Sequence, residues 1–185
     1  MFRGRELFVR VDSGTGRGHH HHVRTAGTFS KFGVPLTELP QLAKLAKSAG
    51  ARIVGLHCHN GSGVFDVNNW EQTATLLASL TEQFPDVRVI DIGGGLGVPE
   101  RAEQPGLDLA KLDTALAAVK AAFPKLELWM EPGRYFVAAA GVLVARVTQL
   151  KSKGSARYVG VATGMNSLIR PALYGSYHEL SLIHI

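Results

Sequence analysis

The sequence predicts an α/β fold, in which a parallel sheet with crossover helices is followed by a β-rich segment. Four short apolar runs of strand character alternate with three helical patterns, and every run ends in polar residues or glycine. Strict alternation of strand and helix is typical of a parallel sheet, because parallel neighbours need a crossover connection between them. Beyond residue 140 the alternation stops, and strand patterns follow one another without helices.

The predicted elements come in a regular order. The strand runs are ELFVRVD (6–12), RIVGLHCH (52–59), VRVIDIGG (87–94) and LELWMEPG (126–133). The helical patterns cover residues 36–49, 66–84 and 108–123. Asp66 and Asp108 stand where helix N-caps are expected, and the third pattern repeats apolar residues at three- and four-residue steps.

The β-rich segment begins at Gly141. GVLVARVTQLKSKG (141–154) and RYVGVATG (157–164) predict two antiparallel strands that a Lys/Ser/Gly turn connects. We therefore expect two domains, 1–140 and 141–185, with the boundary where the helical crossovers end.

The composition narrows the class of protein. With 45% apolar and 19% charged residues in 185, the chain is typical of a globular protein, and its net charge of +5 is too scattered to indicate nucleic-acid binding. A single cysteine excludes an internal disulfide and fits a reducing compartment. The longest apolar run, 136–147, is interrupted by Arg146 and is too short to cross a membrane. We expect a soluble, cytoplasmic protein.

Chemistry-bearing residues follow each predicted strand. Asp12-Ser13-Gly14, the His57/His59 pair, three glycines and Glu131-Pro132-Gly133-Arg134 end the four runs in turn. Because parallel strands present their carboxyl ends at one edge of the sheet, these segments are predicted to form one active site.

The glycine run IDIGGGLGVP (90–99) favours a phosphate cradle, since glycine lets backbone amides approach an anion closely. A dinucleotide fingerprint would require a helix directly after the glycines, but Pro99 interrupts and the next helical pattern starts near Asp108. A plain tight turn is the alternative interpretation.

Three further motifs each leave two interpretations open. Glu131 ends an apolar run and is expected to face a cation or a bound heterocycle, while Arg134 can bind an anion; a structural Glu–Arg pair is the alternative. Arg170 and Tyr174 in SLIRPALYG can hold a carboxylate, or Tyr174 is a core residue. His59 is either a site residue or a satisfied core histidine.

The HCH sequence does not favour a metal site. Strand alternation places His57 and His59 on one face and Cys58 on the other, so the three side chains do not converge on one ion. We expect no metal, and we expect Cys58 to be a small buried residue and no nucleophile.

Together these motifs resemble the fold-type III, alanine-racemase-like family of pyridoxal phosphate enzymes. The resemblance covers residues 6–180 and includes RVDSGTGRGHHHHVRTAGTFSKFG, so it implies that the four histidines 19–22 are a native loop and no tag. It implies the second half of a (β/α)8 barrel over 1–140 and the start of a C-terminal β domain over 141–185. It also implies pyridoxal 5'-phosphate as cofactor and a homodimer.

Within that family the motifs resemble the branch that converts meso-2,6-diaminopimelate to L-lysine and CO2. The resemblance implies that His59 stacks on the cofactor ring and that Glu131 pairs with the pyridine nitrogen, as the two catalytic residues. The residues implied to hold the phosphate are Ser62, Gly93, Gly94, Gly95, Gly133 and Arg134. Those implied to contact the substrate are Arg134, Arg170 and Tyr174.

Some residues of the family pattern have no counterpart in these 185 residues. The Schiff-base lysine and the acid cysteine are absent, and Lys31 belongs to the SKFG turn. Ala162 stands where the family has aspartate, and the final SLIHI departs from the pattern. We therefore expect this chain to be a fragment that is inactive alone.

Two other functions stay open. The first is decarboxylation of another basic amino acid, ornithine or arginine, which Arg170 disfavours because those substrates have no distal carboxylate. The second is a non-catalytic, pyridoxal phosphate-binding or regulatory relative.

Overall fold

The structure is a computed structural model that describes residues 2–14 and 30–182. These residues divide into two compact units, one of residues 1–98 and 106–136 and one of residues 99–105 and 137–185. The histidine run 19–22 lies outside the described residues. The domain boundary at 140/141 stays a prediction.

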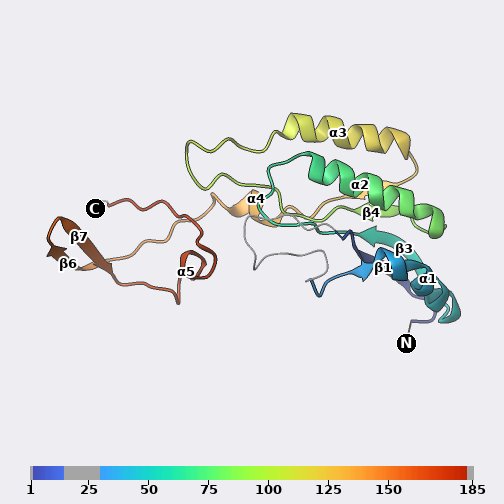
Figure 1. Ribbon diagram of the computed structural model, residues 1–185, viewed down its shortest axis with the longest axis horizontal. Helices are drawn as coiled ribbons and strands as arrows, with labels where there is room; N and C mark the ends of the chain where they lie inside the picture. Colours follow the sequence, from blue (N-terminus) through green and yellow to red (C-terminus); the bar gives the residue numbers. More distant parts are fainter. Residues whose placement is uncertain (1, 15–29, 183–185) are drawn as a thin grey trace. The chain divides into compact units, whose positions relative to one another are not determined.

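The first unit contains a five-stranded, entirely parallel sheet in the order β2-β1-β3-β4-β5, of which β1, β3 and β4 are labelled in Figure 1. Its strands are β1 (Glu6–Asp12), β2 (Val34–Pro35), β3 (Arg52–His57), β4 (Val89–Asp91) and β5 (Glu127–Trp129). The predicted α/β class is therefore confirmed, and all four predicted runs form strands. The first run coincides with β1, whereas the other three runs are longer than the strands observed, because their polar and glycine ends leave the ladder and become the loops of the carboxyl edge.

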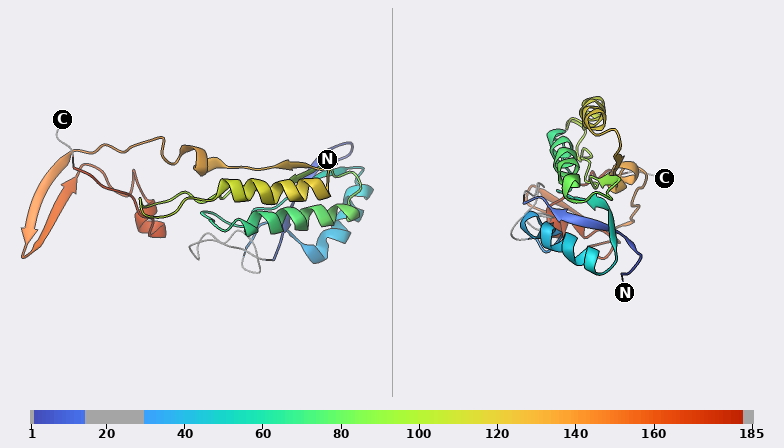
Figure 2. Two further views of the ribbon diagram at one scale, coloured as in Figure 1. Left: turned by 90° about the horizontal axis from the view of Figure 1, so that it is seen from above. Right: turned by 90° about the vertical axis from the view of Figure 1, so that its right-hand side faces the viewer.

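Helices alternate with these strands along the chain. They are η2 (Leu36–Glu38), α1 (Leu39–Ser48), α2 (Asn68–Leu80), η3 (Thr81–Gln83) and α3 (Leu109–Ala122). Helices α2 and α3 pack side by side (Figure 2). Asp108 caps α3 as predicted, with its carboxylate accepting from the Lys111 amide at 2.9 Å. The N-cap predicted at Asp66 was wrong by one residue, because the N-cap of α2 is Val67. The Asp66 carboxylate accepts a hydrogen bond from the Asn68 amide at 3.1 Å.

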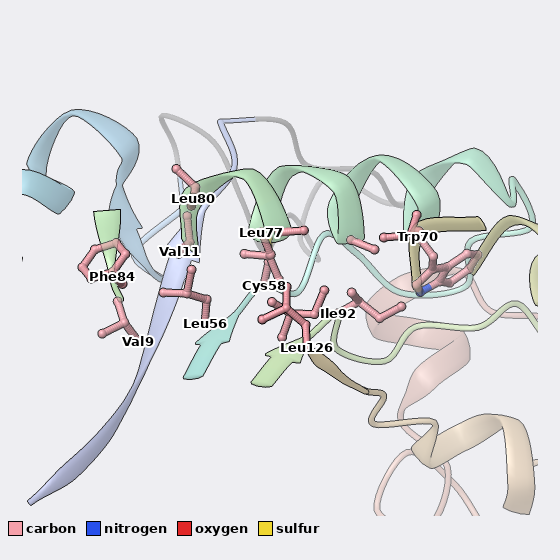
Figure 3. Close-up of a cluster of buried hydrophobic side chains, with 14 of the residues drawn as sticks. Val9, Val11, Leu56, Cys58, Trp70, Leu77, Leu80, Phe84, Ile92 and Leu126 are labelled. Carbon is pink, nitrogen blue, oxygen red and sulfur yellow. The ribbon is translucent and has the colours of Figure 1, made fainter. Parts of the chain in front are cut away.

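The core of this unit lies between the sheet and its helices. Trp70 and Leu77 of α2 and Leu56 of β3 are fully buried there (Figure 3). On β1, Val11 is buried while Phe8 is 46% exposed, so β1 has a covered and an open face. Helix α2 packs against β4 and α3, so the core fixes it beside the strand from which the glycine loop starts.

The second unit contains an antiparallel hairpin and one short helix. The hairpin strands are β6 (Val147–Lys153) and β7 (Ala156–Val161), so the predicted paired strands are confirmed. Helix α5 (Arg170–Tyr174) ends at Gly175, which has a φ of 63°. A further short helix, α4 (Gly133–Val137), lies at the end of the first unit and begins at the glycine of the EPG sequence, and the sequence pattern had not indicated it. Among the described residues, no helix has the length and apolar character needed to cross a membrane.

Candidate active site

The loops that follow β3, β4 and β5 surround a cavity of about 220 Å³ at the carboxyl edge of the sheet. Predicted cofactor-binding residues line this cavity: His59, Ser62, Gly94, Gly95, Glu131, Gly133 and Arg134. Gly93 directly precedes two of them in the chain. The structure therefore brings together residues that lie up to 75 positions apart, while their individual roles stay predictions.

The glycine loop is built for close approach between backbones. A Cβ atom at Gly94 would collide with the carbonyl oxygen of Glu131, and one at Gly95 would collide with the carbonyl oxygen of Gly61. The Val64 amide donates to the Gly95 carbonyl at 2.9 Å, which joins the loops after β3 and β4. A larger residue at 95 would push the glycine loop away from the loop after β3, and one at 94 would push it away from the loop after β5.

Asp91, the last residue of β4, organises the start of the glycine loop. Its side chain is buried, and Oδ1 accepts a hydrogen bond from the Gly93 amide at 2.9 Å. The sequence reasoning missed this role. The signal for it was an acidic residue two positions before a glycine that turns, which is a common way of stabilising a tight loop.

His59 is held in one orientation as a neutral imidazole. Its Nδ1 accepts a hydrogen bond from the Gly94 amide at 3.2 Å. Burial lowers the pKa of His59 below its ordinary value, and the charges of Arg10 and His57 lower it further. The proton therefore lies on Nε2, and the ring cannot turn over without losing its bond to Gly94.

We expect the titration midpoint of His59 to lie below the ordinary histidine value of 6.5, so that the neutral imidazole predominates at pH 6.5. Protonation of Nδ1 removes the acceptor for the Gly94 amide. Because the folded-state pKa is depressed, the stabilisation is complete above the unfolded pKa and is lost as the pH falls through the folded pKa. The measurement is an NMR titration of the imidazole in the full-length protein, with His59→Gln to assign the resonance. A midpoint at or above 6.5 would contradict this prediction.

Ser62 and Arg134 form a polar pair at one side of the cavity. The Arg134 Nη2 donates to the Ser62 Oγ at 2.9 Å, which joins the loop after β3 to the start of α4. A guanidinium and a hydroxyl together offer several hydrogen-bond donors to a phosphate group. This pair is the chemically most suitable anion-binding feature of the cavity.

Glu131 follows β5 by two residues and lies beside His57. Its Oε2 is 3.3 Å from the His57 Nε2, and its side chain is 57% exposed. Glu131 is therefore open to solvent, because β5 ends at Trp129 and Glu131 lies in the loop that opens onto the cavity. An exposed carboxylate at a cavity wall is free of the desolvation cost that burial would impose.

His57, Asp91 and Glu131 also bring three possible metal-ligand atoms within 4.8 Å of one another. We assign no metal to them, because Asp91 already accepts from Gly93 and Glu131 is open to solvent. Cys58 takes no part in this group. It is fully buried, as expected, and burial raises the pKa of its thiol, which disfavours the reactive thiolate.

Arg170 and Tyr174 belong to the second unit and form the two ends of α5. The Arg170 Nη2 donates to the Ser176 Oγ at 3.0 Å and lies 3.8 Å from the Glu100 Oε1. The Glu100 Oε2 also accepts from the Tyr177 amide at 3.3 Å. The sequence reasoning had not identified Glu100 as a partner of Arg170, because 70 residues separate them.

Residues 1–138 match the family model described as the pyridoxal binding domain of pyridoxal-dependent decarboxylases. The chain belongs to this family. The prediction of pyridoxal phosphate as the cofactor is thereby confirmed, and the glycine loops and the Ser62–Arg134 pair of the cavity suit its phosphate group.

Relatives and solved structures agree with this family. The chain is 35% identical over 186 residues to a diaminopimelate decarboxylase of Escherichia coli K12 (97% of this chain, 44% of the relative). It is 38% identical over 183 residues to that of Aquifex aeolicus (94% and 42%). The crystal structure of diaminopimelate decarboxylase from Helicobacter pylori with L-lysine superposes with a TM-score of 0.83 at 29% identity (96% and 45%). The crystal structure of SrLDC in complex with PLP and cadaverine superposes with a TM-score of 0.75 at 27% identity, over 94% of this chain and 43% of that one.

This pyridoxal-dependent decarboxylase chain therefore spans less than half the length of the relatives it matches. The likeness covers nearly all of the 185 residues and includes both compact units.

Proposed function

We propose that the protein decarboxylates meso-2,6-diaminopimelate to L-lysine and CO2 with pyridoxal phosphate. The observation that carries this proposal is the cavity at which His59, Glu131 and the Ser62–Arg134 pair meet. The substrate assignment is supported by the relatives, which are diaminopimelate decarboxylases at 35% and 38% identity.

Bound pyridoxal phosphate supplies an electron sink that accepts the electron pair left behind when a carboxylate departs as CO2. The residues of this chain bind and orient the reactants. Glu131 would hold the proton of the ring nitrogen, and neutral His59 would lie against the ring without adding charge. Ser62 and Arg134 would bind the phosphate group, together with the amides of the glycine loop.

Arg134, Arg170 and Tyr174 are proposed to contact the substrate. Diaminopimelate carries an amino acid group at each end, and the distal carboxylate needs a cation. Ornithine and arginine lack that carboxylate, so Arg170 favours diaminopimelate over them. We also propose that the protein is a homodimer and that it lies in the cytoplasm. The free, buried Cys58 fits the second proposal, because a reducing compartment preserves a thiol.

The test is an assay of the full-length protein for CO2 release from meso-diaminopimelate, ornithine, arginine and lysine. We expect turnover of meso-diaminopimelate to exceed that of the other three. Preference for ornithine, arginine or lysine would overturn the substrate assignment. Cofactor binding without any decarboxylation would favour the non-catalytic alternative.

We further expect Arg170→Gln to raise the KM for meso-diaminopimelate about 10-fold or more, because a charge-assisted hydrogen bond to a carboxylate is lost. Steady-state kinetics of the full-length protein measure this change. Arg157→Gln, on the exposed strand β7, is the matched control and should leave KM unchanged. An Arg170→Gln protein with the wild-type KM would contradict the role of Arg170.

A further inference from the structure

A buried hydrogen-bond network lies directly behind the loop that carries His59 and Ser62. At its centre is Asn60, whose exposed fraction is 7%. The Asn60 Oδ1 accepts from the Ser13 Oγ at 2.7 Å and from the Cys58 Sγ at 3.0 Å. One amide group thus joins the segment after β1 to the segment after β3.

The other side of the amide reaches helix α2. The Asn60 Nδ2 donates to the Thr73 Oγ1 at 2.7 Å, and the Thr73 Oγ1 donates to the Asn69 carbonyl at 2.5 Å. A hydroxyl has one proton, and Thr73 gives it to Asn69. Thr73 can therefore only accept from Asn60, which fixes which end of the amide faces the helix.

Within the described residues, backbone pairing holds this loop only at its two ends, since after Cys58 it resumes at Val64, whose amide donates to the Gly95 carbonyl at 2.9 Å. The ladder of β3 ends at His57, and the Cys58 amide makes one further bond to the Asp91 carbonyl at 2.9 Å. Beyond it, Asn60 ties the loop to α2, which packs over the sheet with Trp70 and Leu77 (Figure 3). His59 and Ser62 lie on either side of this anchor.

We propose that Asn60 is a positioning residue for the cofactor site: it sets the places of His59 and Ser62 by tying their loop to Ser13 and Thr73. Asn60 touches neither substrate nor cofactor in this role. The inference rests on the proposed function, because His59 and Ser62 are its cofactor-binding residues. Its consequence is that a residue of α2, Thr73, contributes to cofactor affinity from behind the loop.

The experiment measures the dissociation constant of pyridoxal phosphate from the full-length protein by absorbance, and the thermal stability of the same samples. Asn60→Ala and Thr73→Val are each expected to weaken cofactor binding about 10-fold or more, as loss of a residue that orients a ligand-binding group does. Thr73→Val preserves shape, so it keeps the test valid if Asn60→Ala fails to fold. Thr73→Ser restores the hydroxyl and should restore the affinity.

Thr114→Val is the matched control, because Thr114 is an exposed residue of α3 whose hydroxyl bonds only within its own helix, to Ala110, in the contacts described. It should bind cofactor as the wild type does. In a Ser62→Ala background, Thr73→Val should cost less affinity than in the wild type, because both changes act on one loop.

A folded Thr73→Val protein with wild-type cofactor affinity would overturn the positioning role of Asn60. If the loss of cofactor affinity caused by Thr73→Val added fully to the loss caused by Ser62→Ala, the positioning role would be overturned as well, since the effect would then reflect a general loss of stability. A wild-type protein that binds pyridoxal phosphate but decarboxylates nothing would overturn the proposed function alone. A wild type that binds no cofactor would overturn both.

Discussion

Replacing Glu131 with glutamine is expected to lower kcat of the full-length protein about 100-fold or more, the scale seen when a preorganised electrostatic contact is removed. Glutamine keeps the size of the side chain but cannot carry the negative charge that stabilises a proton on the ring nitrogen. The Glu131 carboxylate is 57% exposed at the cavity wall, and glutamine keeps a hydrogen-bonding group beside its recorded neighbour, the His57 Nε2 at 3.3 Å. Affinity for pyridoxal phosphate should therefore fall far less than kcat.

Steady-state kinetics and the absorbance spectrum of the bound cofactor measure the two effects separately. Glu127→Gln is the matched control: Glu127 is an exposed residue of β5, and its carboxylate accepts only a bond from the Trp129 indole at 3.2 Å among the contacts described. It should leave kcat unchanged. An unchanged kcat in Glu131→Gln would show that the charge of Glu131 takes no part in the reaction.

The meeting of the site residues could be predicted because it follows from topology. His59, Gly94 and Glu131 each lie in the loop that follows a strand, and parallel strands all end at the same edge of their sheet. Local composition was enough to place these three strands, so the meeting of the site residues could be predicted without knowledge of any side-chain contact. The same reasoning placed the β6–β7 hairpin, since its turn and its two apolar runs are contiguous.

The features that sequence reasoning missed depend on contacts between distant residues. Asn60 meets Ser13 across 47 positions and Thr73 across 13, and no local pattern distinguishes Asn60 from a loop residue exposed to water. Strand β2 has two residues, too few for any periodicity, and it exists because Val34 pairs with Val11. The run 126–133 predicts a strand that includes Glu131, but its composition does not show that the strand ends at Trp129.

The second large effect concerns the glycine loop. Gly95→Ala is expected to lower the free energy of unfolding of the full-length protein by about 3 kcal/mol, because it adds backbone strain to steric overlap. Gly95 has a φ of 92°, which residues with a side chain rarely adopt, and its new Cβ would collide with the Gly61 carbonyl oxygen. Both partners are backbone, so no side chain can rotate away.

The same substitution should also weaken the binding of pyridoxal phosphate, because the loops after β3 and β4 would have to separate around the cavity. Urea unfolding measures the stability, and absorbance titration measures the affinity. Gly106→Ala is the matched control, since Gly106 has ordinary backbone angles and no atom lies within 4 Å of the place its new methyl group would take. Its stability should stay within about 0.5 kcal/mol of the wild type. If Gly95→Ala were as stable as Gly106→Ala, the two loops would not pack as closely as the hydrogen bond from Val64 to Gly95 implies.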